Sequence, residues 1–108
     1  MTTPFVTQLR SRRSTIRLAA EGTAAITIRV EMPEVWDVVA LTVSPDESVV
    51  NVKKHALEAL FPEAQLHTDF VVKLRGWEIL DENASLADAG AIDGSILLLT
   101  HRRRRAVR

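Results

Sequence analysis

The side chains able to do acid–base, nucleophilic or metal chemistry are dispersed along this 108-residue chain. His55, His67 and His101 are spaced too widely to indicate a metal cluster, and no serine or acid stands at a catalytic spacing from them. The sequence contains no cysteine, which excludes thiolate nucleophiles, disulfides and zinc–cysteine sites. We therefore predict no active site, no metal site and no bound cofactor.

Two pairs of adjacent carboxylates, Asp46-Glu47 and Asp81-Glu82, have the composition of acid–base partners. Adjacent acids in loops are usually solvated turn or cap residues. We interpret both pairs in that way, as structural residues in contact with water.

The densest group of charged side chains is the run His101-Arg102-Arg103-Arg104-Arg105. Clustered guanidiniums can contact nucleic-acid phosphates, anionic lipids or an acidic protein surface. Because no aromatic residue is interleaved for stacking on bases, the run favours an acidic protein partner over nucleic acid. We expect an electrostatic anchor formed by Arg102, Arg103, Arg104 and Arg105. Self-association of the basic tails with another copy's acidic domain is an alternative.

The formal net charge of zero hides a segregation of charge along the chain. Residues 1–25 carry +3 and residues 101–108 carry +5, whereas residues 26–100 hold 13 acidic and five basic side chains and so carry −8. The length is that of one domain. We predict a flexible basic arm over 1–25, one domain over 26–100 and an Arg-rich tail over 101–108.

The composition, 46% hydrophobic and 26% charged, is that of a soluble globular protein. No apolar run approaches the roughly 20 residues of a membrane-spanning helix. The first 25 residues lack the continuous apolar region of a secretory signal. We expect a cytoplasmic protein of unknown oligomeric state.

Alternating apolar and polar residues predict the strands that carry these groups. Apolar side chains recur at every second position over 26–32 and over 39–43, with Pro33-Glu34 between them, which indicates two strands joined by a hairpin loop. Further strands are predicted over 70–74 and 95–100, with a short one around 78–80.

A single amphipathic helix is predicted between the second and third strands. Val49, Val52, Ala56 and Leu60 recur at spacings of three and four, which places them on one helix face. The Ser48 hydroxyl is suited to cap the first turn, and Pro62 ends the helix near Phe61. The order is strand, strand, helix, strand, strand, strand, the fifth element being the short one.

Several motifs within this order resemble ubiquitin over residues 26–100. The run from Val43 to Lys53, which includes Asn51-Val52-Lys53, is similar to the entry into the ubiquitin helix, and Leu86-Ala87-Asp88 and Asp93-Gly94-Ser95 are similar to its later turns. The resemblance implies an α+β, ubiquitin-like β-grasp fold in which a mixed sheet wraps one helix. Bacterial YukD/EsaB-type proteins, which accompany type VII secretion systems, look closest, and they imply a secretion-system component as the partner.

Conjugated ubiquitin-like modifiers end in Gly-Gly, because an extended carboxylate without side chains must thread a narrow adenylating site. The alignment with ubiquitin places Arg105 and Ala106 at those positions, and no glycine follows Gly94. We therefore predict a non-conjugated adaptor that binds protein partners and is not an enzyme. An atypical modifier and a nucleic-acid-binding accessory protein that uses its Arg-rich tails are the alternatives.

The main binding surface of ubiquitin centres on an isoleucine whose place is taken here by Lys73. Alternation directs Val72, Leu74, Leu97 and Leu99 inward and leaves apolar neighbours of Lys73 on the outer face. The predicted partner-binding residues are Val35, Trp36, Val71, Lys73, Ile96, Leu98 and Thr100. Coverage of this patch by the N-terminal arm is an equal alternative. Trp77 is expected to pack over a loop.

Overall fold

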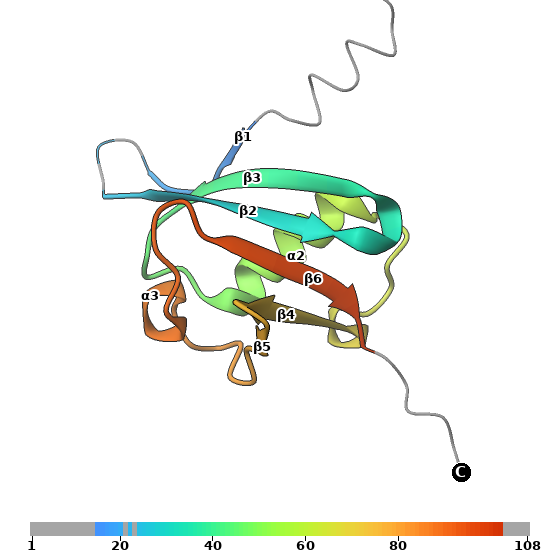
Figure 1. The fold of residues 1–108 in the computed structure, drawn as a ribbon. Coiled ribbons are helices and arrows are strands. Elements are labelled where there is room, and N and C mark those ends of the chain that lie inside the picture. Colours follow the sequence, from blue (N-terminus) through green and yellow to red (C-terminus); the bar gives the residue numbers. More distant parts are fainter. Residues whose placement is uncertain (1–14, 21, 23, 103–108) are drawn as a thin grey trace, which may run out of the picture.

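The chain forms an α+β domain in which a six-stranded mixed sheet packs against one main helix (Figure 1). The computed structural model describes residues 15–20, 22 and 24–102. Its elements are β1 (Thr15–Arg17), β2 (Ile26–Met32), β3 (Asp37–Val43), α2 (Val49–Leu60), β4 (Phe70–Leu74), β5 (Trp77–Glu78), α3 (Leu86–Ala89) and β6 (Ile96–His101), with short 3-10 helices at Pro33–Val35 and His67–Asp69. No helix in these ranges combines the length and the hydropathy that a membrane crossing requires.

The strand order in the sheet is β1-β3-β2-β6-β4-β5. Strand β2 is antiparallel to β3 and parallel to β6, while β4 is antiparallel to both β6 and β5. The last strand of the sequence therefore lies in the middle of the sheet, beside the strand that begins the predicted domain.

The alternation read from the sequence corresponds to the two faces of this sheet. Ile28, Val30 and Met32 of β2 are fully buried, whereas Arg29 between them is exposed. Leu97 and Leu99 of β6 point into the same core, as predicted. Removing a leucine side chain from water contributes roughly 2 kcal/mol, so this inner face supplies much of the stability of the fold.

Helix α2 covers the inner face of the sheet (Figure 1) and begins at the predicted cap. The Ser48 hydroxyl accepts a hydrogen bond from the Asn51 amide at 3.2 Å, which satisfies a first-turn N–H group. The helix ends at Leu60, immediately before Phe61-Pro62, because proline disfavours helical backbone in the residue that precedes it. The helix buries Val49, Val52, Ala56 and Leu57 against the sheet.

Strand β1 differs from the flexible arm expected over residues 1–25. Thr15–Arg17 pairs in parallel with β3 at the edge of the sheet, and Ile16 packs partly buried against the core. Three residues are too short to show an alternation in the sequence, which is why no strand was expected here. Residues 1–14 lie outside the described part of the chain.

Candidate protein-binding face

The loop between β2 and β3 presents a tryptophan to solvent. Trp36 is 93% exposed and adopts a left-handed backbone conformation with φ of 55°. Its amide closes the turn by donating to the Pro33 carbonyl at 3.1 Å. A bulky residue rarely adopts this conformation, which costs about 1 kcal/mol or more. The fold therefore accepts both backbone strain and the exposure of a large indole at this position.

Glu34 fastens this loop to the end of β6. One of its carboxylate oxygens accepts from the Thr100 hydroxyl at 2.6 Å and from the His101 amide at 2.8 Å. Partial burial, the largest single effect, acts to raise the pKa of Glu34, but these two hydrogen bonds and the charge of His101 together hold the pKa below its ordinary value. The loop that carries Trp36 is thus held in place by a charge-assisted contact.

The outer face of the sheet carries two aliphatic side chains of β6 among charged neighbours. Ile96 is 48% exposed and lies opposite Arg29 of β2. Leu98 is half-buried and lies between Glu31 of β2 and Lys73 of β4. This arrangement offers apolar contact area that is flanked by side chains of both charge signs.

Val71 is not exposed apolar surface, and that expectation is wrong. It lies on the outer face opposite Thr100 but is only 5% exposed. Arg102 donates from Nε to the Thr68 carbonyl at 3.2 Å and places Nη1 3.7 Å from Glu78 Oε2. The aliphatic part of an arginine held in this way can cover apolar surface.

The remaining predicted contact residues do not form one continuous apolar patch. Val35 packs partly buried against the core, and the Thr100 hydroxyl is occupied by Glu34. Lys73, Ile96 and Leu98 share the outer face, and Trp36 stands at the hairpin tip. Of the predicted electrostatic anchor, Arg102 lies on the sheet, while residues 103–105 lie outside the described ranges.

Trp77 is also exposed, which contradicts the expectation that it packs over a loop. Its side chain is 79% exposed at the start of the edge strand β5. Arg75 and Gly76 both have positive φ, 53° and 84°, and together they form the tight two-residue turn that joins β4 to β5. This turn directs the indole away from the core.

A buried lysine was not anticipated from the sequence. Lys53 is 1% exposed, and its ammonium group donates to the Phe70 carbonyl and to Glu82 Oε1, both at 2.7 Å. Glu82 is therefore an ion-pair partner and not the solvated loop acid that we expected. The spacing of the helix could have predicted this burial, because Lys53 follows Val49 by four residues and therefore lies on the same buried face.

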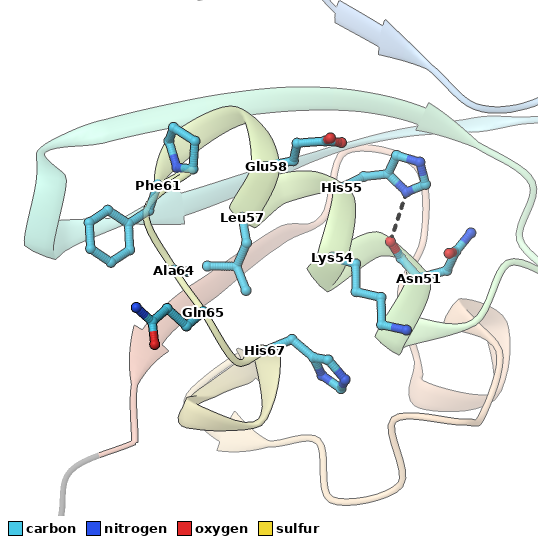
Figure 2. Close-up of a pocket in the computed structure, with 10 residues that line it drawn as sticks. Asn51, Lys54, His55, Leu57, Glu58, Phe61, Ala64, Gln65 and His67 are labelled. Carbon is cyan, nitrogen blue, oxygen red and sulfur yellow. Dashed lines mark hydrogen bonds between the residues drawn. The ribbon is translucent and has the colours of Figure 1, made fainter.

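A groove lined by both polar and apolar side chains lies between the exposed side of α2 and the segment that follows it (Figure 2). Its volume is about 430 Å³, and its walls include Leu57, Phe61 and Lys54. The His55 ring contacts the Asn51 carbonyl through Nδ1 at 3.0 Å, so that nitrogen is the donor. His67 Nδ1 is buried without a hydrogen-bond partner in the described structure. No group of three metal-ligating side chains is found here or elsewhere in the described ranges.

No protein-family model matches this chain, and no curated protein matches it. Its architecture is nevertheless similar to that of many solved structures. The ubiquitin-like domain of an Arabidopsis thaliana protein is 15% identical, with a TM-score of 0.63 over 84% of this chain and 92% of that one. The ubiquitin-like domain of Plasmodium falciparum Dsk2 is 20% identical, with a TM-score of 0.61 over 72% of this chain and 99% of that one. Ubiquitin from Caldiarchaeum subterraneum is 15% identical, with a TM-score of 0.62 over 77% of this chain and 100% of that one.

The chain has the ubiquitin-like β-grasp fold. Structural similarity at such low sequence identity shows the fold alone, so the partner must be argued from the residues of this chain. None of these three neighbours is named as a YukD/EsaB-type protein.

Lys73 is half-buried on the outer face and lies opposite Leu98 on one side and Glu78 on the other. The resemblance to ubiquitin aligns this lysine with the central isoleucine of that protein's binding surface. The exposed apolar side chains of the predicted set are Ile96, at the start of β6, and Trp36, at the hairpin tip.

Proposed function

We propose that this ubiquitin-like domain is a protein-interaction module that binds its partner through the outer face of the sheet. Ile96 and Leu98 supply apolar contact, Lys73 supplies a central cation, and Trp36 supplies an anchor at the hairpin tip. The observation that carries the proposal is Trp36, an indole that is 93% exposed on a strained backbone. Tryptophan is enriched among the side chains that dominate binding energy at interfaces.

The pre-positioning of this tip supports the same function. The contact of Glu34 with the end of β6 fixes the loop before a partner arrives. A loop that is already ordered loses less conformational entropy on binding. The indole of Trp36 is thus presented to a partner from a fixed loop.

We further propose that the module acts as a non-conjugated adaptor, because Arg105 and Ala106 occupy the positions at which a transferable modifier carries glycines. The resemblance to YukD/EsaB-type proteins supports a component of a bacterial type VII secretion system as the partner. Detection in the native cell of higher-mass species in which this protein is covalently attached to other proteins would contradict the adaptor proposal.

The test is affinity capture from the native cell by tagged wild-type protein and two variants, with quantification of the proteins retained. Leu98→Asp should reduce recovery of the specific partner by about tenfold or more, because it replaces an apolar side chain of the contact area with a carboxylate that must lose water on binding. Leu66→Asp is the matched control, since Leu66 is an exposed leucine in the segment after α2. Recovery that is equal for wild type and Leu98→Asp, with both chains folded, would refute the site.

A further inference from the structure

Strand β1 lies at one edge of the sheet, beside β3 (Figure 1). Thr15, Ile16 and Arg17 are in register with Ala40, Leu41 and Thr42. The Thr42 carbonyl accepts from the Leu18 amide at 2.8 Å and from the Ala19 amide at 3.2 Å. The backbone N–H and C=O groups of one strand residue point to the same side of the strand. The backbone groups of Thr42 therefore face β1, whereas those of Leu41 face β2.

The side chains of residues 15–18 show which kind of peptide fits against the edge of β3. Ile16 and Leu18, two positions apart, are partly buried and pack against the core. Thr15 and Arg17 between and beside them are exposed. The edge thus binds an extended backbone that carries aliphatic side chains at alternate positions.

The attachment of β1 is local and short. It is a three-residue strand in parallel pairing, which is slightly less stable per residue than antiparallel pairing. Its last residue, Arg17, and the first residue of β2, Ile26, lie at the same end of β3. They are separated by two strand spacings, about 10 Å, and eight residues of chain can span roughly 25 Å. The connection therefore has enough slack for β1 to leave the edge while the remaining strands stay paired.

We propose that the edge of β3 is a docking site for an extended peptide with aliphatic side chains at alternate positions, and that β1 occupies this site when no such peptide is bound. Departure of β1 uncovers the backbone groups of Ala40 and Thr42, which form a template for strand addition. The site is separate from the outer face, so a failure of either proposal leaves the other standing.

Amide hydrogen exchange in the native full chain tests whether β1 opens alone. The amides of Ala40 and Thr42 should exchange at least about a hundredfold faster than those of Leu41 and Val43, because opening of β1 needs less free energy than opening of the central sheet. Equal protection of all four amides would overturn the proposal, since β1 would then be part of the cooperative core.

A peptide titration tests whether the vacated edge binds in trans. The probe is a blocked synthetic peptide of residues 13–20, added at up to millimolar concentration to 15N-labelled full-length protein. The Ile16→Asp substitution should release β1, and the variant should then bind the peptide, with changes in the amide chemical shifts of Ala40 and Thr42. The wild type should bind the peptide at least about tenfold more weakly, because its own strand competes for the edge.

Thr15→Asp is the matched control, since it adds the same charge at an exposed position of the same strand. This variant should behave as the wild type does. Absence of peptide binding to a folded Ile16→Asp chain, or equal binding to all three proteins, would overturn the proposal. A wild-type dimer whose Thr42 contacts arise from the other copy's β1, detected in mixed-label spectra, would also overturn it.

Discussion

Lys53 illustrates how the domain accommodates a fully buried charge. Its ammonium group has a carboxylate and a backbone carbonyl as partners, so the desolvation of the ion is offset by two short hydrogen bonds. The contact also links α2 to β4 and to the loop that contains Glu82. The residue therefore joins three segments that are distant in sequence.

Replacing this lysine should be costly for stability. Lys53→Met should lower the free energy of unfolding by about 2–4 kcal/mol, because Glu82 loses its counter-ion and the Phe70 carbonyl loses its donor. Urea denaturation followed by circular dichroism measures the change. Lys54→Met, on the exposed side of the same helix, is the control and should shift stability by less than about 0.5 kcal/mol. Equal effects of the two variants would contradict the structural role assigned to Lys53.

Glu34 should make a small, pH-dependent contribution to stability. Its pKa is lowered in the folded state, so the contribution is fully present above the pKa of the unfolded chain and is lost as pH falls through the lower, folded pKa. Glu34→Gln should cost less than about 1 kcal/mol at pH 7, since the group is exposed. The difference between wild type and variant, measured by urea denaturation from pH 7 to pH 3, should shrink toward acid. A difference that grows toward acid would contradict the lowered pKa.

At the scale of elements, the β2–β3 hairpin combines strands that are buried on one face with a tip that is exposed to solvent. Its strands bury their inner faces, whereas its tip exposes a tryptophan in a conformation that glycine adopts more easily. The hairpin thus has at its tip a residue whose backbone conformation lowers the stability of the fold.

Substitutions at Trp36 should distinguish backbone strain from side-chain function. Trp36→Gly should be up to about 1 kcal/mol more stable than Trp36→Ala, because only glycine adopts positive φ without steric cost. Urea denaturation provides the comparison. Both variants should lose affinity for the partner, because both lack the indole. Retention of wild-type affinity by either one would remove Trp36 from the proposed site.

The regular elements could be predicted from the sequence because their signals are periodic. The strand over 26–32 and the helix with its Ser48 cap follow from alternation and from the spacing of apolar residues. Strand β1 could not be predicted, because three residues carry no period. The exposure of Trp77 beside the turn at Arg75-Gly76 and the burial of Val71 on the outer face follow only from the three-dimensional arrangement.

At the scale of the whole molecule, the candidate site is assembled from two segments that are distant in the sequence. The face combines the hairpin near residue 36 with β6 near residue 98, and Glu34 joins the two. The motifs shared with ubiquitin predicted this arrangement at the level of the fold. They did not predict which side chains remain available, because that depends on ion pairs and hydrogen bonds between residues that are distant in the sequence.

The central position of β6 also governs how the domain is made. One edge of β2 stays unpaired until residues 96–98 of β6 pair with it, and one edge of β4 likewise stays unpaired until β6 is in place. Pairing over such sequence separations is slow, because a long loop must close first. A ribosome must therefore synthesise the chain through β6 before the sheet can close, and until then the unpaired edges of β2 and β4 can pair with another chain.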